Sequence, residues 1–103
     1  MNKITNLKEL KSGAFINFDY KGTKAILVKT ASGKVVAYSS VCPHEGGIIE
    51  WDINLHKLLC ECHLSIFNVE DGSVYRYSSV FDNMKNLTPI PLKIDDKQDV
   101  YAL

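Results

Sequence analysis

Two short Cys/His pairs constrain the fold of this chain more than any other feature. Cys42 and His44 form the first pair, and Cys60 and His63 form the second, with residues 45–59 between them. Thiolate is a soft ligand that suits zinc and iron–sulfur centres, and imidazole suits zinc or iron. The spacing therefore predicts two loops that each supply one sulfur and one nitrogen and that meet around one metal centre.

The order of the ligands within each pair separates the possible centres. Common structural zinc sites use cysteines two to four residues apart, a spacing that the ligand pairs do not show. In a mixed Cys/His diiron cluster, the cysteines bind one iron and the histidines bind the other, so each loop must reach both irons. The short Cys-x-His and Cys-x-x-His spacings allow this reach. A structural zinc-binding module stays as a remote alternative, which colour and metal analysis would distinguish.

The residues around the pairs extend the pattern, and with them the chain resembles the Rieske [2Fe–2S] family over roughly residues 35 to 92. The accompanying residues of the resemblance are Pro43, Gly46, Ser65, Phe67, Asp71 and Gly72. The resemblance implies one Rieske-type [2Fe–2S] cluster with four ligands, namely Cys42, His44, Cys60 and His63. It also implies that the cysteines hold the iron that stays ferric and that the histidines hold the iron that is reduced.

Four further residues are expected next to the cluster: Gly46, Leu64, Ser65 and Phe67. Leu64 replaces the glycine that the family usually has after the second histidine. Gly47 stands where high-potential members have a disulfide cysteine, and Phe67 stands where they have a tyrosine. The resemblance therefore predicts a potential in the lower or middle part of the family range of about −150 to +300 mV. Cys62 is interpreted as a spectator thiol, and its role stays open.

Size and composition indicate one domain over residues 1–103, with 46% apolar residues to fill a core. There is no long uncharged apolar run, so no membrane span is expected. No signal sequence is apparent at the N-terminus, which predicts a cytoplasmic protein. Three cysteines do not make a disulfide framework.

Charge is unevenly distributed although the net charge is zero, which gives no reason to expect nucleic-acid binding. Residues 1–41 hold seven lysines against Glu9 and Asp19, a net charge of +5. Residues 42–82 hold seven carboxylates against Lys57 and Arg76, a net charge of −5. Two interpretations stay open, an ordinary solvated surface or an acidic docking face that steers a basic redox partner.

The pattern of short apolar segments and turns predicts an all-β fold, a small sandwich or barrel of antiparallel sheets. Residues 4–11 are expected to form a short helical turn capped by Thr5 or Asn6. The expected strands cover residues 14–20, 24–30, 34–39, 48–51, 57–59, 66–69, 74–77, 91–94 and 100–103. The family resemblance adds three stacked sheets, with a cluster-binding segment over approximately residues 41–80 at one tip.

The predicted function is that of a one-electron carrier rather than an enzyme, most simply a soluble ferredoxin. The family implies a flavin-containing reductase as donor and an oxygenase or another oxidoreductase as acceptor. The chain alone does not supply the mononuclear iron site of an oxygenase, because only His56 remains once the cluster ligands are assigned. The alternative is a small Rieske redox subunit permanently bound within a larger oxidoreductase. A membrane respiratory subunit is disfavoured because no anchor and no disulfide cysteine are seen.

Overall fold

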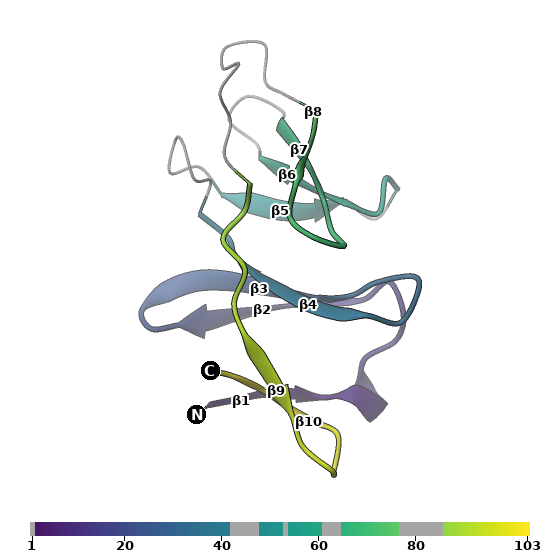
Figure 1. The fold of residues 1–103 in the computed structure, drawn as a ribbon, viewed down its shortest axis with the longest axis vertical. Coiled ribbons are helices and arrows are strands. Elements are labelled where there is room, and N and C mark those ends of the chain that lie inside the picture. The colour runs from purple at the N-terminus through teal and green to yellow at the C-terminus, as the bar shows by residue number, and fades with distance from the viewer. Residues whose placement is uncertain (1, 42–47, 53, 61–64, 77–85) are drawn as a thin grey trace.

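The computed structural model describes residues 2–41, 48–52, 54–60, 65–76 and 86–103. The strands in these ranges form three antiparallel sheets stacked as layers (Figure 1). This confirms the predicted all-β class of stacked antiparallel sheets. The base sheet has the order β1-β10-β9, the middle sheet β2-β3-β4, and the upper sheet β5-β6-β7-β8.

The strand bounds match the predicted segments closely, with one addition at the N-terminus. The strands are β1 (Asn2–Asn6), β2 (Phe15–Tyr20), β3 (Thr23–Lys29), β4 (Val35–Ser39), β5 (Ile49–Asp52), β6 (Lys57–Cys60), β7 (Ser65–Asn68), β8 (Val74–Arg76), β9 (Leu92–Ile94) and β10 (Asp99–Ala102). The addition is β1, where the sequence predicted a helical turn over residues 4–11. The helical part is only a 3-10 turn, η1 (Leu7–Glu9), and Asn6 caps it by accepting a hydrogen bond from the Lys8 N–H.

Strand β1 forms because it pairs with β10, which lies near the other end of the chain. It pairs antiparallel with β10, and Asn2 lies opposite Ala102. The Asn6 side chain donates to the Asp99 carboxylate at 2.8 Å, and Lys3 forms an ion pair with the same carboxylate at 3.2 Å. These two contacts lower the pKa of Asp99, the Asn6 hydrogen bond more than the Lys3 contact. Pairing between the two ends of the chain therefore overrides the local helical signal.

The middle strand β3 is the centre of the molecule because both of its faces are buried. Ile26 and Val28 face a core shared with the upper sheet, and Ala25 and Leu27 face a core shared with the base sheet. All four side chains are at most 1% exposed. A strand covered on both faces requires a continuous apolar run rather than an alternating one, and residues 25–28 supply it.

A connecting segment over residues 86–91 crosses the layers and ties them together (Figure 1). The Leu87 N–H donates to the Gly72 carbonyl in the turn of the upper sheet, and the Ile90 N–H donates to the Ala37 carbonyl in β4. Between these two bonds, Pro89 forms an isolated bridge with Tyr38. This proline-containing stretch lies outside the named strands.

Candidate metal-cluster site

The first ligand loop is closed at its base by contacts between its two stems. Val41 and Ile48 form an isolated antiparallel bridge. The Ile49 N–H donates to the Ser40 carbonyl at 2.7 Å. These bonds fix the positions at which the chain enters and leaves residues 42–47. Predicted site residues Cys42, His44 and Gly46 lie outside the described residues.

The second ligand loop begins and ends beside the first. Strand β6 ends at Cys60, β7 begins at Ser65, and these two residues pair directly across the strands. Cys60 also pairs with Ile49 on its other side. Residues Ile49, Cys60 and Ser65 therefore form one row across the end of the upper sheet, and both ligand loops emerge from this row. His63, Leu64 and Cys62 lie outside the described residues.

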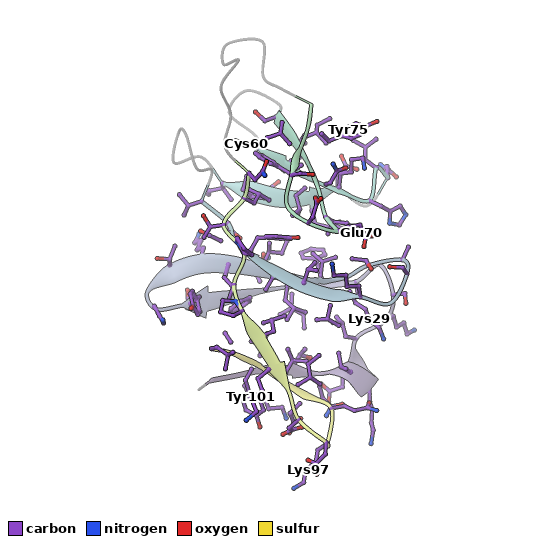
Figure 2. The ribbon with its side chains drawn as sticks, viewed as in Figure 1. Lys29, Cys60, Glu70, Tyr75, Lys97 and Tyr101 are labelled. Carbon is purple, nitrogen blue, oxygen red and sulfur yellow. The ribbon has the colours of Figure 1, made fainter. Side chains whose placement is uncertain are left out.

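The Cys60 side chain is fully buried at this end of the sheet (Figure 2). It belongs to the apolar core that includes Ile49, Leu58 and Phe67. Phe67 is also fully buried and lies opposite Leu58, two residues along β7 from Ser65. Residues two apart on a strand point to the same face, so Phe67 and Ser65 both point inward. The structure therefore places Phe67 in the apolar core next to Cys60.

Ser65 carries the clearest sign of a missing partner. Its side chain is fully buried, and its Oγ has no hydrogen-bond partner in the structure as described. Leaving a buried hydroxyl unpaired costs about 1 to 3 kcal/mol. Directly opposed residues of an antiparallel pair have Cβ atoms about 4.5 to 5.5 Å apart, which puts this hydroxyl beside Cys60. A cluster bound to the Cys60 sulfur would offer acceptor atoms at this position, so the residues present fit such a group.

The upper sheet is held on the middle sheet by a contact that the sequence did not indicate. Tyr38 in β4 donates from its hydroxyl to the Val69 carbonyl at 2.8 Å, and this bond is buried. The turn after Val69 is closed by Asp71, whose carboxylate accepts from the Ser73 hydroxyl at 2.6 Å and the Ser73 N–H at 2.9 Å. These two bonds, the hydroxyl contact first, lower the pKa of Asp71. No local signal points from Tyr38 to Val69, because they are joined only by packing of the two sheets.

The acidic residues that the structure describes in the 42–82 segment are divided between the two ends of the upper sheet. Asp52 ends β5, and Glu70 and Asp71 lie in the turn between β7 and β8. Both positions are at the end of their strands opposite to the Ile49–Cys60–Ser65 row. Glu50, next to Ile49, is the acidic side chain that the described residues place near that row. The described residues therefore do not gather the negative charge into one face around Cys60.

Comparison with known proteins gives evidence on the family of this chain that does not depend on these contacts. The model of the Rieske [2Fe-2S] domain matches residues 1–86. The fold is similar to the crystal structure of the cyanobacterial plasma membrane Rieske protein from Synechocystis PCC 6803, with a TM-score of 0.82, 17% identity, and 100% and 99% of the two chains covered. It is also similar to the ferredoxin of carbazole 1,9a-dioxygenase from Nocardioides aromaticivorans IC177, with a TM-score of 0.70, 18% identity, and 98% and 94% covered.

A curated sequence relative is the chloroplastic cytochrome b6-f complex iron-sulfur subunit of Volvox carteri. It is 38% identical over 58 residues, which are 54% of this chain and 28% of the relative. The chain therefore spans less than a third of that relative's length. Within the described ranges, no helix is long and apolar enough to cross a bilayer.

Proposed function

Because this chain belongs to the Rieske [2Fe-2S] domain family, whose members hold one Rieske-type cluster, we propose that it is a one-electron carrier of the ferredoxin type. The proposed cluster ligands are Cys42, His44, Cys60 and His63. The observation that supports this assignment best is the row of Ile49, Cys60 and Ser65, from which both ligand loops emerge. A buried thiol beside an unpaired buried hydroxyl is the environment that a bound cluster would complete.

When bound, the cluster supplies a site that accepts and releases one electron, at a potential raised by the two histidine ligands. The chain itself supplies what the cluster needs from its surroundings, which is support, shielding from water and a hydrogen bond. The paired stems keep the two loops together, the apolar core around Cys60 keeps water from one side, and the Ser65 hydroxyl is placed to donate a hydrogen bond. Such hydrogen bonds to cluster sulfurs and restricted solvent access are the usual means by which a protein adjusts the potential.

The donor and acceptor proposed are a flavin-containing reductase and an oxygenase. The fold similarity to the ferredoxin of carbazole 1,9a-dioxygenase supports the oxygenase as acceptor, and the reductase as donor is what the family resemblance implies. Such encounters are expected to be weak, with small interfaces. A single domain over residues 1–103, a cluster segment near 41–80 and a cytoplasmic location remain predictions.

The ligand assignment is tested by electron paramagnetic resonance of the dithionite-reduced protein together with iron, sulfide and zinc analysis. We expect the signal of a mixed Cys/His diiron cluster, and its loss in Cys60→Ser. Cys62→Ser is the matched control, because it removes a nearby thiol that we interpret as a spectator, and it should keep the signal. His63→Gln should lose the Rieske signal, while the same change at the exposed His56 should keep it. A stoichiometric zinc ion and no iron–sulfur signal would refute the proposal.

A second candidate is a small Rieske subunit bound permanently within a larger oxidoreductase. The sequence match to the cytochrome b6-f complex iron-sulfur subunit, with 38% identity over 58 residues, favours it. Native size-exclusion chromatography of cell extract distinguishes the two candidates. A ferredoxin elutes as a small protein free of other chains, whereas a subunit co-elutes with a complex that survives moderate salt.

A further inference from the structure

Strand β2 forms an open edge of the middle sheet, whose strand order is β2-β3-β4. Its register with β3 runs without a shift from Phe15, opposite Val28, to Tyr20, opposite Thr23. With six residues it is the longest edge strand among the described strands, and it contains no proline or lysine. A long edge without a bulge, a proline or a lysine is a site where another strand can add. Neither the family assignment nor the proposed electron transfer uses this edge.

The other sheet edges in the described part of the chain are covered, interrupted or short. The outer edge of β4 is covered by the connecting segment, because the Ser39 N–H donates to the Thr88 carbonyl. Strand β1 has a register shift between Lys3 and Thr5. The edge strands β5, β8 and β9 have four, three and three residues. Covers, bulges and short strands are the usual protections of a sheet edge, and β2 lacks them.

The hydrogen bonds of β3 show which backbone groups of β2 point outward. Lys24 in β3 bonds toward β4, because its carbonyl accepts from the Ser40 N–H at 2.9 Å. Alternate residues of a central antiparallel strand bond to opposite neighbours, so every second residue after Lys24 also bonds to β4. The residues of β2 that lie opposite these positions are Asp19, Asn17 and Phe15. Their N–H and C=O groups therefore point away from β3, and no backbone hydrogen bond among the described residues uses them.

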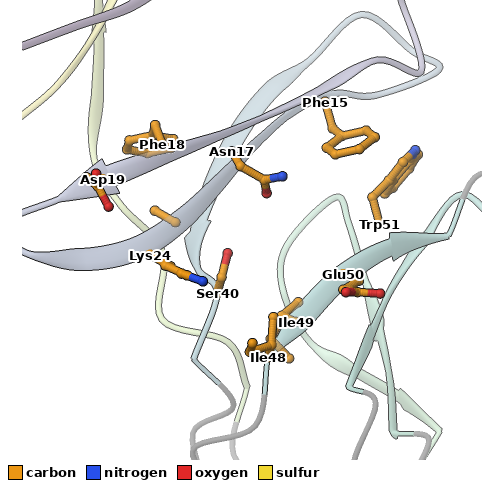
Figure 3. Close-up of a pocket in the computed structure, with 11 residues that line it drawn as sticks. Phe15, Asn17, Phe18, Asp19, Lys24, Ser40, Ile48, Ile49, Glu50 and Trp51 are labelled. Atoms are coloured by element: carbon orange, nitrogen blue, oxygen red, sulfur yellow. The ribbon is translucent and has the colours of Figure 1, made fainter.

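Grooves on both faces of β2 leave room for the side chains of an added strand. One groove, with a volume of about 630 Å³, lies between β2 and β5 (Figure 3). The other, with a volume of about 440 Å³, lies between β2 and the base sheet, where Ile4 and Leu103 line it. Side chains of a strand alternate between its two faces. An added strand would therefore place its side chains in the two grooves in turn.

We propose that the added strand is β2 of a second copy of this chain, paired antiparallel around a two-fold axis at Asn17. With Asn17 opposite the partner's Asn17, Phe15 lies opposite the partner's Asp19, so the outward backbone groups of both strands are all paired. On the face toward the base sheet, Ile16 lies opposite the partner's Phe18. Both side chains are partly buried and apolar, and such cross-strand pairs stabilise a sheet. This proposal is independent of the redox function.

The same register accounts for two large apolar side chains that are exposed in the groove. Phe15 is 44% exposed and Ile48 is 48% exposed, and Figure 3 shows Phe15 at the opposite end of β2 from Asp19. Ser40 bonds to Lys24, which lies opposite Asp19. Ile48 lies on this side of the groove, because the residue after it bonds to Ser40. In the dimer the partner's Phe15 lies opposite Asp19 and reaches the end that holds Ile48, which removes both apolar side chains from water.

The charges on this edge permit two copies to meet. Asp19 lies opposite Lys24 in its own sheet, and on its other side this register places the partner's Phe15 rather than a second carboxylate. Like charges directly opposite each other destabilise a strand pair. The two Asp19 positions are offset by four residues, about 14 Å along the strands, which exceeds the screening length of about 8 Å at physiological ionic strength. The zero net charge of the chain adds no general repulsion.

Sedimentation of the cluster-loaded protein over a range of concentrations tests the dimer, and the weight-average mass should rise from one chain toward two. Asn17→Pro should weaken the association about tenfold or more, because it removes an outward N–H without breaking a bond to β3. Ile94→Pro is the matched control on the edge strand β9, where Asp95 rather than the exposed Ile94 bonds to β10. It should associate as the parent protein does.

Two charge variants test the register itself. Asn17→Asp and Asn17→Lys each place like charges directly opposite one another in the dimer, so each alone should sediment as one chain. An equimolar mixture of the two should dimerise, because opposite charges then face each other. An unchanged visible spectrum shows that each variant keeps its fold and its cluster. A parent protein that stays a single chain at every concentration, a dimer that survives Asn17→Pro, or a mixture that stays monomeric would each overturn the proposal.

Discussion

The buried hydroxyl of Tyr38 donates a 2.8 Å hydrogen bond to the carbonyl of Val69, and this bond joins the middle sheet to the sheet that carries Cys60. Tyr38 is 2% exposed and Val69 is 5% exposed. The bond lies at the turn end of the β7–β8 hairpin, whose first strand begins at Ser65. Tyr38 therefore helps to orient the sheet from which both ligand loops emerge.

Tyr38→Phe should lower the free energy of unfolding by about 1 to 3 kcal/mol, because the Val69 carbonyl stays buried and loses its donor. Urea denaturation at equal cluster content measures the change. Tyr20→Phe is the matched control, since it removes a hydroxyl that donates to the Leu103 carbonyl at 2.7 Å at an exposed site. Water can replace that bond, so the control should lose less. Equal losses in the two variants would contradict a special role for Tyr38.

The stability of the protein should depend on Tyr38 at alkaline pH. Burial, with a smaller effect of the Asp71 and Glu70 charges, raises the pKa of Tyr38 from 10.0 to about 12. Because the folded protein holds the proton more tightly than the unfolded chain, this contribution to stability is complete below pH 10 and is lost as the pH rises toward 12. Urea midpoints measured from pH 9 to pH 12 should fall more steeply in the parent protein than in Tyr38→Phe. Parallel slopes would argue against ionisation of this group on unfolding.

Gly72 is expected to tolerate no side chain. Its φ is +75°, and an added Cβ would lie 2.7 Å from Cε1 of Tyr38. Gly33 has a similar φ of +91° but nothing within 4 Å of an added Cβ. The positive φ alone costs about 1 to 3 kcal/mol in either alanine variant, and Gly72→Ala adds the clash. Thermal unfolding should therefore show a larger loss for Gly72→Ala than for Gly33→Ala. Matching losses would mean that the Tyr38 ring moves aside freely.

Ser65→Ala should lower the reduction potential while it leaves the fold intact. The hydroxyl has no partner among the described residues, so its removal breaks no internal bond, and a donor to the cluster would favour the more negative reduced state. Voltammetry of Ser65→Ala beside the exposed control Ser12→Ala measures the shift. A potential equal to that of the control would show that the Ser65 hydroxyl does not reach the cluster.

The elements that the sequence predicted best are those set by local turn chemistry. The β2–β3 hairpin turns at Lys21 and Gly22, both of which have positive φ angles, 51° and 82°. The β7–β8 turn lies between the predicted segments 66–69 and 74–77, and in it the Asp71 side chain accepts from the backbone two residues on. Strand β1 was predicted wrongly as part of a helical turn, because its partner β10 is nearly one hundred residues away. Periodicity within one segment carries no information about such a partner.

Within the site, the sequence indicated which side chains can bind the cluster, but it did not indicate how they are supported. The donor atoms and their spacing are properties of short segments, and so they can be interpreted without a fold. The row of Ile49, Cys60 and Ser65, the unpaired hydroxyl of Ser65 and the groove beside Ser40 are different in kind. The row is set by the strand register of the upper sheet. The burial of these groups arises when the base and upper sheets pack on the two faces of the middle sheet, and this packing brings together groups that are distant in the chain. Residue chemistry and turns were therefore determined locally, whereas burial and pairing were decided by the tertiary structure.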